Sequence, residues 1–245
     1  GIFDAHVEAP TAYPDPQAPL LLGVPVAPGL MESIGTNQEA FAREAQKSAR
    51  QMLASMPGNI SNSFACGMGP LSNAISRHGR LSDLIVFPSM RLPGFIDVID
   101  SFLSALTHIQ RPVVVAPETV SGMTCRRIAI GWNGSRSAAR AVMASVPLLN
   151  RAEKVFVLSV AEAHAKAPVA GLEEYLALHG IKIDRKTARL GPPSVGDMLA
   201  QGAADLGADL LVIGGYGHSH LREAFLGGVT ADVLARATIP IFLAH

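Results

Sequence analysis

Glycines gather near the C-terminal end of the chain, at two places where backbone amides could bind an anion. Gly214 and Gly217 follow the apolar segment 209–213, which reads as a buried strand. A second pair, Gly227 and Gly228, directly precedes a predicted helix. The first N–H groups of a helix have no partner inside it, and the helix dipole adds positive potential there, so such a place suits a phosphate. Glycines would also let a ligand approach the backbone closely.

These glycines could instead be ordinary turn and cap residues, and that structural alternative stays open for each of them. Their spacing, however, resembles the nucleotide-binding signature of the universal stress protein family. That signature is Gly, two residues, Gly, nine residues, Gly, and then Ser or Thr. Gly214, Gly217 and Gly227 match its glycines, whereas Gly228 stands at the hydroxyl position and Thr230 follows two residues later.

The resemblance covers residues 126–245 and implies an adenine nucleotide as the ligand, namely ATP with or without Mg²⁺. Family members usually carry Asp where this chain has Asn133, which keeps hydrogen-bonding capacity but gives up the charge. Val160 resembles the position whose backbone meets the adenine. The residues predicted to bind the nucleotide are Asn133, Val160, Gly214, Gly217, His218, Arg222, Gly227, Gly228, Val229 and Thr230.

The candidates outside the glycine pairs have structural alternatives as well. The sequence 133–135 fits an Asn-Gly turn followed by a serine that caps a helix. Val160 fits a plain core residue. His218 and Arg222 begin the segment beside the glycines, where they could contact a phosphate or lie on a solvated helix face.

Little in the sequence predicts catalysis or metal binding. His218 and His220 are separated by one residue and would diverge on a helix, and no third ligand accompanies them. The motifs GxxxxGK[ST], GxSxG and HExxH are absent, and no carboxylate pair stands out as acid and base. We therefore predict no metal site and no catalytic residue, with slow ATP hydrolysis as the most that the chain would catalyse.

Composition limits the partners and the compartment. The chain has 245 residues, 49% of them hydrophobic, and a formal net charge of +0 without runs of like charge, so neither a nucleic acid nor a membrane is expected as a partner. Cys66 and Cys125 form no CxxC pair, and we expect free thiols in a reducing cytoplasm. No apolar stretch approaches the roughly 20 residues that span a bilayer. The start, Gly1–Asp4, has neither signal-peptide features nor an initiator Met, which suggests a processed or incompletely represented N-terminus.

Strand and helix patterns alternate along the chain, which indicates parallel sheet with right-handed crossovers. In the first half the expected elements are strand 1–8, helix 36–56, strand 62–66, helix 70–78, strand 83–87, helix 95–108 and strand 112–116. In the second half they are strand 127–131, helix 135–149, strand 155–160, helix 172–179, strand 181–188, helix 194–206, strand 209–213, helix 229–236 and strand 240–244.

The sequence pattern of the two halves indicates a duplicated domain. Segment 83–87 matches 209–213 at an offset of 126, and 112–116 matches 240–244 at an offset of 128. At the four glycine positions the first copy carries Pro88, Arg91, Ile99 and Asp100. An Asp would repel a phosphate and an Ile would block its close approach, so this copy is predicted not to bind. It also starts at the second strand of the pattern, unless the segment at the N-terminus is the opening strand.

The predicted fold is α/β, with two tandem doubly wound parallel-sheet domains of the adenine nucleotide α-hydrolase-like type, 1–121 and 122–245, packed as a pseudo-dimer. A homodimer and a protein partner stay open. The resemblance implies binding or signalling in the stress response, with ATP held by the second domain. The alternatives are an interaction or scaffold member that binds no nucleotide, and an enzyme of the wider α-hydrolase-like group.

Overall fold

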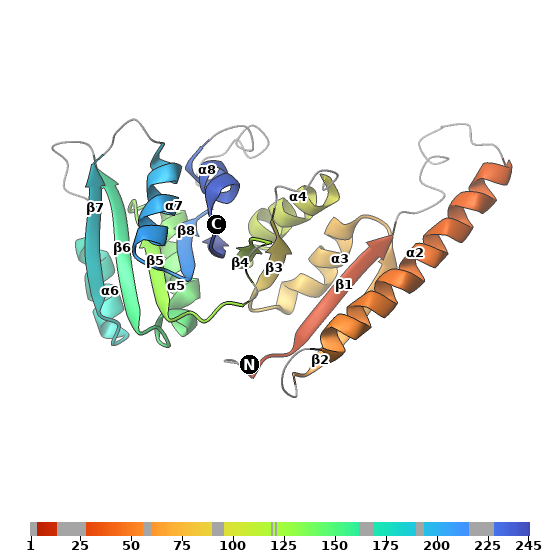
Figure 1. Ribbon diagram of the computed structural model, residues 1–245, viewed down its shortest axis with the longest axis horizontal. Coiled ribbons are helices and arrows are strands. Elements are labelled where there is room, and N and C mark those ends of the chain that lie inside the picture. The colour runs from red at the N-terminus through yellow and green to blue at the C-terminus, as the bar shows by residue number, and fades with distance from the viewer. Residues whose placement is uncertain are drawn as a thin grey trace. The chain divides into compact units, whose positions relative to one another are not determined.

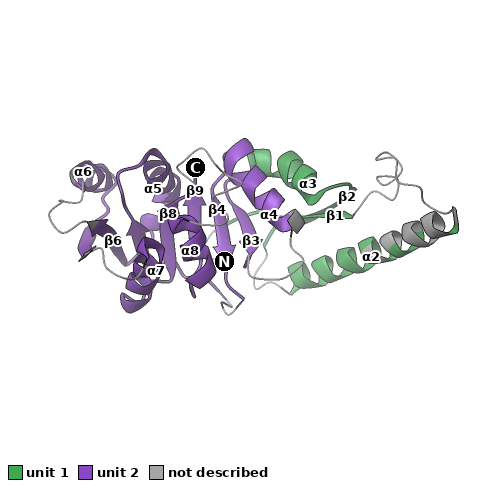
Figure 2. Cartoon of the chain, turned by 90° about the horizontal axis from the view of Figure 1, so that it is seen from above, with its two compact units in different colours: residues 1–81 green, residues 82–245 purple. Residues whose placement is uncertain are grey.

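The computed structural model of the chain forms two compact units, Gly1–Leu81 and Ser82–His245 (Figure 2). It describes residues 4–13, 28–55, 60–89, 96–118, 120, 122–161, 169–189, 194–215 and 228–245. No helix in these ranges is long and apolar enough to cross a lipid bilayer. The units are defined by packing, whereas the expected boundary at residue 121 follows the duplication of the sequence, so that boundary stays a prediction.

The first unit is a two-stranded parallel sheet with two helices. Strand β1 (Val7–Tyr13) pairs with β2 (Asn62–Met68). Helix α2 (Pro28–Ala54) contacts both strands, and α3 (Leu71–His78) contacts β1. The order strand, helix, strand, helix therefore agrees with the sequence pattern for this part of the chain.

Two predicted boundaries in the first unit are wrong. A strand was expected at 1–8, but β1 begins at Val7 and continues through Pro10 to Tyr13. Proline is tolerated in a strand that is paired on one side, because its missing N–H leaves no gap in the ladder when it faces the free edge. The helix expected at Thr36 begins at Pro28, and proline suits the first helical position because an N–H there would have no helical partner.

The second unit is built on a seven-stranded sheet (Figure 1). Its strands are β3 (Ile85–Pro88), β4 (Val113–Ala116), β5 (Arg127–Gly131), β6 (Lys154–Ala161), β7 (Ile183–Arg189), β8 (Leu210–Gly214) and β9 (Ile241–Ala244). They lie in the order β3-β4-β9-β8-β5-β6-β7, and all neighbours are parallel except β4 and β9. The second copy therefore has the predicted doubly wound parallel sheet, with β5 and β8 at its centre.

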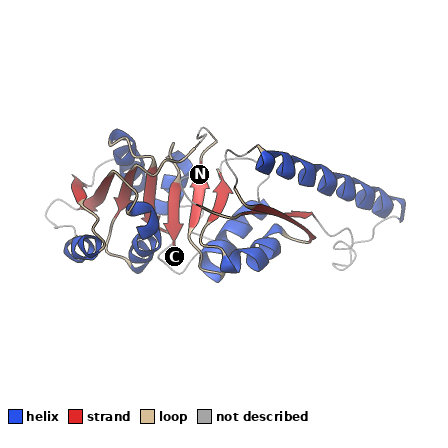
Figure 3. Ribbon diagram, turned by 90° about the horizontal axis from the view of Figure 1, so that it is seen from below, coloured by secondary structure: helices blue, strands red, loops and turns tan. Residues whose placement is uncertain are grey.

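Helices cover both faces of this sheet (Figure 3). They are α4 (Ile96–Leu103) with a π-helical continuation (Ser104–His108), α5 (Arg136–Leu149), α6 (Ala170–Leu178), α7 (Val195–Asp205) and α8 (Val229–Arg236). Two glycines identify the faces. A Cβ on Gly214 would touch Ser137 of α5, whereas a Cβ on Gly131 would touch Leu199 of α7. Gly131 is opposite the residue before Gly214, so α5 and α7 cover opposite faces.

Strand pairing confirms the internal repeat. In the first copy Ile85 of β3 lies opposite Val113 of β4. In the second copy Leu211 of β8 lies opposite Ile241 of β9. These pairs are the positions that the sequence offsets of 126 and 128 bring into correspondence. The two copies thus share the register of their last two strands as well as the apolar pattern.

The copies join through their last strands, β4 and β9, which pair antiparallel. Val114 lies opposite Phe242, with Val113 opposite Leu243 on one side and Val115 opposite Ile241 on the other. Val114 and Phe242 are equivalent positions of the repeat, so the pairing is symmetric about them. Two-fold related subunits meet through equivalent residues in the same way, and the sheet junction therefore has the expected pseudo-dimer symmetry.

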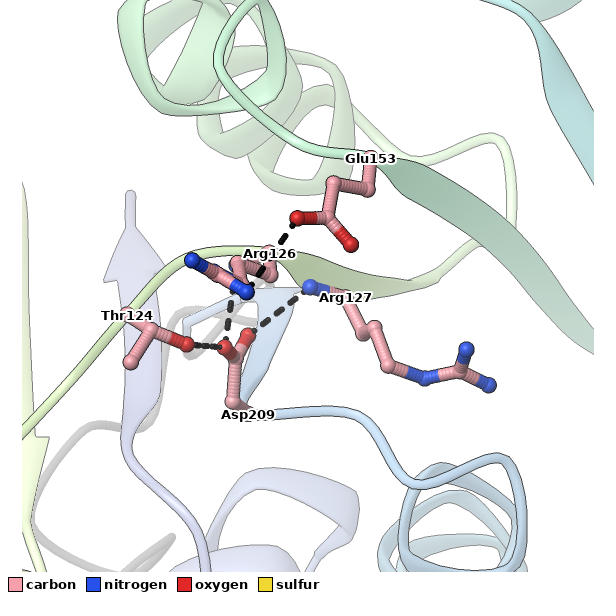
Figure 4. A network of polar contacts seen from close by, with 5 residues as sticks. All are labelled: Thr124, Arg126, Arg127, Glu153 and Asp209. Atoms are coloured by element: carbon pink, nitrogen blue, oxygen red, sulfur yellow. Dashed lines mark hydrogen bonds and ion pairs between the residues drawn. The ribbon is translucent and has the colours of Figure 1, made fainter.

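Asp209 anchors the start of β5 beside β8 (Figure 4). Its Oδ2 atom accepts hydrogen bonds from the Thr124 hydroxyl and, at 2.9 Å, from the Arg126 N–H. Its Oδ1 atom accepts from the Arg127 N–H at 3.1 Å. Arg126 also forms an ion pair with Glu153, with 3.4 Å between Nη1 and Oε1. Bonds from amides to a carboxylate are charge-assisted, so this side chain fixes where the central strand begins.

Cys125 lies next to this network and is 1% exposed. Burial and the nearby Asp209 carboxylate raise the pKa of its thiol to about 11, which leaves about 0.1% thiolate at pH 8. Cys66 is exposed. Because the thiolate is the reactive form, we expect one fast thiol per native chain in a DTNB assay at pH 8 and two after unfolding. The Cys66→Ser variant should show none until it is unfolded; a fast thiol in native Cys66→Ser would contradict the burial of Cys125.

Candidate functional site

The carboxyl ends of β5 and β8 define the candidate site. The two strands are neighbours, with Gly131 opposite Ile213 at their ends. The chain leaves β5 toward β6 on one side and leaves β8 toward β9 on the other. In doubly wound sheets, ligands bind in the crevice where connections diverge in this way. The loop that starts α5 and the glycine segment that follows β8 both begin at this edge.

The loop after β5 is a hydrogen-bonded turn that starts α5. The Oδ1 atom of Asn133 accepts from the Ser135 N–H at 3.0 Å, and the Ser135 Oγ atom accepts from the Ala138 N–H at 3.2 Å. Gly134 between them has a φ of 74°, a value that favours glycine. The turn-and-cap alternative is therefore confirmed for these residues. A nucleotide contact of Asn133 stays a prediction. It would use the side-chain amide nitrogen, because the Oδ1 atom already accepts a hydrogen bond from the Ser135 N–H.

Gly214 is required by packing inside the protein. A Cβ at this position would lie 2.5 Å from the Ala138 nitrogen and 2.7 Å from the Ser137 carbonyl carbon, both in the first turn of α5. No real Cβ atom approaches backbone that closely, so any larger residue would push α5 away from β8. The space on the side-chain side of Gly214 is thus filled by protein, and a ligand could reach this residue only through its other backbone atoms.

Thr230 connects the start of α8, which follows Gly228, to Gly214 at the end of β8. It lies in the first turn of α8, is 9% exposed, and donates from Oγ1 to the Gly214 carbonyl oxygen at 3.4 Å. Residues that are 16 positions apart in the sequence therefore meet at the end of β8. A phosphate site formed by both glycine pairs requires the end of β8 and the start of α8 to lie together. In the described part of the chain they are in contact.

Gly228 precedes α8 with φ 120° and ψ 161°, and no side chain caps the helix there. This region of backbone conformation is essentially restricted to glycine. A Cβ would meet no atom within 4 Å, so conformation rather than space selects glycine. A Ser or Thr, which the family signature places here, would be strained in this backbone.

The start of α8 is held in place by α7. A Cβ on Gly196 of α7 would lie 2.8 Å from the Val229 carbonyl oxygen, so the two helices touch without an intervening side chain. Arg236 at the other end of α8 forms an ion pair with Asp197 of α7. The backbone of Val229 and Thr230 is therefore fixed by helix packing before any ligand binds.

Sequence reasoning missed a third group at this edge, formed by the last residues of the chain. The Gly215 N–H donates to the Ala244 carbonyl oxygen at 2.8 Å, and the His245 Nδ1 atom lies 3.0 Å from the Gly215 carbonyl oxygen. Arg140 of α5 donates to the His245 carbonyl oxygen at 2.8 Å. No local pattern marks His245, because its role depends on which strand lies next to β9.

Several predicted binding residues cannot be placed. Gly217, His218, Arg222 and Gly227 lie outside the described residues. Val160 is half-buried near the end of β6, opposite Ala188 of β7, and its contact with adenine stays a prediction. Within the described ranges, no three His, Cys, Asp or Glu side chains are grouped as a metal site would require.

A cavity of about 170 Å³ lies away from this edge, at the junction of the two copies. It is lined by residues that follow β3 and β4, by the end of α8 and by the start of β9, namely Ser89, Val115, Pro117, Glu118, Leu234, Ala237, Thr238 and Ile241. None of the residues predicted to bind a nucleotide lines it. The glycine site and this cavity are therefore separate features.

Comparisons with known proteins agree with the fold of the whole chain. The model of the universal stress protein family matches residues 124–245. No curated protein matches the sequence. A universal stress protein from Archaeoglobus fulgidus has a similar solved structure, with a TM-score of 0.64 and 14% identity over 96% of this chain and 95% of that one.

Two solved structures from Pseudomonas aeruginosa are also similar over their full length. One, considered a universal stress protein, gives a TM-score of 0.54 with 14% identity over 100% of this chain and 95% of that one. The other, a protein of unknown function, gives 0.54 with 12% identity over 96% and 92%. At such identities the likeness concerns the fold alone. It covers both copies of the repeat and supports two tandem α/β domains.

Proposed function

Because this chain belongs to the universal stress protein family through residues 124–245, we propose that its second copy binds an adenine nucleotide, ATP, at the carboxyl ends of β5 and β8. The observation that carries the proposal is the contact between Thr230 and Gly214, which brings the start of α8 to the end of β8. A helix start without a side-chain cap, beside the glycines that end β8, offers amides and positive potential to a phosphate. ATP would be bound with or without Mg²⁺.

Binding or signalling in the stress response, rather than catalysis, is the activity we propose. The side chains described at this edge include the amide of Asn133 and the hydroxyls of Ser135 and Thr230. Each suits a hydrogen bond to a nucleotide, and efficient hydrolysis would need a general base as well. Slow hydrolysis of a bound nucleotide would be compatible with this proposal.

A second candidate function is protein interaction without a nucleotide. It is favoured by the structural reasons found for two motif glycines, since α5 requires Gly214 and backbone conformation requires Gly228. The missing hydroxyl at position 228 would weaken phosphate binding by about 1–2 kcal/mol, roughly tenfold, which is too little to abolish it. Nucleotide binding therefore stays the first candidate.

Equilibrium titration with a fluorescent ATP analogue, with and without Mg²⁺, tests the proposal. We expect saturation below millimolar nucleotide, and binding at least about tenfold weaker in Gly217→Val, where the added side chain blocks the close approach of the ligand. Gly171→Ala is the matched control, because no atom lies within 4 Å of the added methyl group in α6.

The titration separates the candidates. Absence of saturation at millimolar nucleotide in the unmodified chain would favour the interaction function. Saturation with unchanged affinity in Gly217→Val would mean that the nucleotide binds elsewhere. Circular dichroism of both variants shows whether the fold is retained.

A further inference from the structure

The cavity at the junction of the two copies has a volume of about 170 Å³. The elements around it, β3, β4, α8 and β9, all belong to the second compact unit (Figure 2). Its apolar lining is buried, since Val115 is 4% exposed, Leu234 9% and Ile241 1%. An engineered apolar cavity of roughly 150 Å³ in another protein binds benzene. The junction cavity therefore has room for a molecule of that size.

The equivalent place on the other side of the junction is filled by protein. Three residues of the cavity have counterparts there at the sequence offsets of the repeat, namely Gly215 for Ser89, Leu243 for Val115 and Leu106 for Leu234. A Cβ on Gly215 would lie 2.8 Å from the Leu106 Cδ2 atom and 3.5 Å from the Leu243 Cδ2 atom. The counterparts therefore pack against one another so closely that not even a methyl group fits between Gly215 and Leu106.

Side chains that differ between the copies account for the cavity. Ser89 is buried and carries a side chain where its counterpart is glycine, so a leucine cannot approach this position as closely as it does on the other side. Val115 is one methylene group smaller than its leucine counterpart, and Ala237, which follows α8, is smaller than its counterpart Ile109. Smaller side chains in a lining leave space that the fold does not fill. The cavity is thus specific to one side of the junction.

Two polar side chains of the cavity are available to a ligand. Glu118 and Thr238 lie at exposed positions of the lining, and neither side chain forms a hydrogen bond or ion pair with another described residue. Glu118 is the only charged residue among the described residues that line the cavity. Arg236, which lies close by in the chain, is already ion-paired with Asp197 of α7. A buried apolar lining with a carboxylate at its exposed side suits an apolar molecule that carries a positive charge.

We propose that the junction cavity is a binding site for a small amine whose apolar body is about the size of a benzene ring. The apolar body would lie against Val115, Leu234 and Ile241, and the ammonium group would bind the Glu118 carboxylate. The Thr238 hydroxyl would accept a second hydrogen bond from the ammonium group. None of the residues predicted to bind a nucleotide lines this cavity, so the site is additional to the proposed ATP site and does not depend on it.

Benzylamine is the probe, added to the full chain, and benzyl alcohol is its uncharged analogue of similar shape. Binding is followed in ¹H–¹³C spectra of the Val, Leu and Ile methyl groups. We expect saturable shifts at Val115, Leu234 and Ile241, with half-saturation at about millimolar benzylamine. Benzyl alcohol should cause shifts at the same methyl groups but bind about fivefold more weakly, because it lacks the charge that pairs with the carboxylate.

Two variants test the charge and the space separately. Glu118→Gln removes the charge at an exposed position. It should weaken binding of benzylamine about fivefold and leave binding of benzyl alcohol unchanged. The matched control is Glu174→Gln, at an exposed position of α6 outside the cavity lining, and it should bind both compounds as the unmodified chain does. Ala237→Ile introduces the residue type of the filled counterpart and should weaken both compounds by at least about tenfold, because the larger side chain occupies the space.

Three results would overturn the proposal. Absence of saturable methyl shifts at benzylamine concentrations far above millimolar would show that the cavity is a packing defect. Equal affinities for the two compounds, or unchanged affinity for benzylamine in Glu118→Gln, would exclude an amine as the preferred ligand. Unchanged affinity in a folded Ala237→Ile variant would mean that benzylamine binds elsewhere. Circular dichroism shows whether each variant is folded, and Glu118→Gln still tests the proposal if Ala237→Ile is not.

Discussion

Gly214→Ala is expected to lower the free energy of unfolding of the second unit by about 3 kcal/mol. The new methyl group would lie 2.5 Å from the Ala138 nitrogen and 2.7 Å from the Ser137 Oγ atom. Backbone and a buried side chain cannot both yield, so α5 must move away from the central strand. Urea unfolding followed by the fluorescence of Trp132, the single tryptophan of the chain, measures the change. Trp132 directly follows β5, and its signal therefore reports on this unit.

Gly171→Ala is the matched control for this experiment. No atom lies within 4 Å of a Cβ at Gly171, and alanine is favoured over glycine in a helix by up to about 1 kcal/mol. Its free energy of unfolding should stay the same or rise slightly. An equal loss in both variants, or no loss in Gly214→Ala, would contradict the close approach of α5 to β8.

Asp209→Ala is expected to destabilise the same unit by about 3 kcal/mol, because amides bonded to a carboxylate lose a charge-assisted partner. The amides of Arg126 and Arg127 and the hydroxyl of Thr124 would all lose their acceptor. The start of β5 would then keep its strand pairing, the Arg126–Glu153 ion pair and the bonds from the Arg127 side chain to the carbonyl oxygens of Leu206 and Gly207. Thermal or urea unfolding followed at Trp132 gives the size of the effect.

Asp184→Ala serves as the control for the loss of an aspartate. Asp184 is exposed on β7, and its carboxylate forms no hydrogen bond or ion pair to the other described residues. Its removal should change the free energy of unfolding by less than about 0.5 kcal/mol. Similar losses in Asp184→Ala and Asp209→Ala would show that net charge, and not the hydrogen bonds at the start of β5, sets the stability.

Most of the fold could be predicted from local patterns. The apolar segments that became β5, β8 and β9 are short, and glycine, proline or charged residues border them, which specifies buried parallel strands. The repeat was visible because Asp83 and Asp209 open similar segments. Strand register confirms both the offsets and the alternation of strand and helix.

The direction of the junction could not be predicted, because a fully buried strand has the same composition in either direction. The sequences of β4 and β9 are both short apolar runs after a proline, and nothing in them distinguishes parallel from antiparallel pairing. The extent of β1 was missed for a related reason. Pro10 argues against a strand locally, and it is acceptable because β1 pairs with no described strand other than β2.

The candidate site was only partly predictable, because a glycine in a motif can have several causes. The sequence could place Gly214 at the end of a strand, but it could not show that α5 fills the space beside it. It could place Gly228 before a helix, but the φ of 120° emerges only from the fold. The same holds for Asp209, whose hydrogen bonds depend on which strand lies next to β8.

The antiparallel junction means that the duplicated halves no longer correspond to separable bodies. β3 and β4 come from the first copy, yet they complete the sheet of the second. A fragment that begins near residue 122 would lack β4. The peptide groups along one edge of β9 would then have no partner strand. The two copies of the repeat therefore share one sheet, and neither could be moved to another protein without covering the strand edge that its removal exposes.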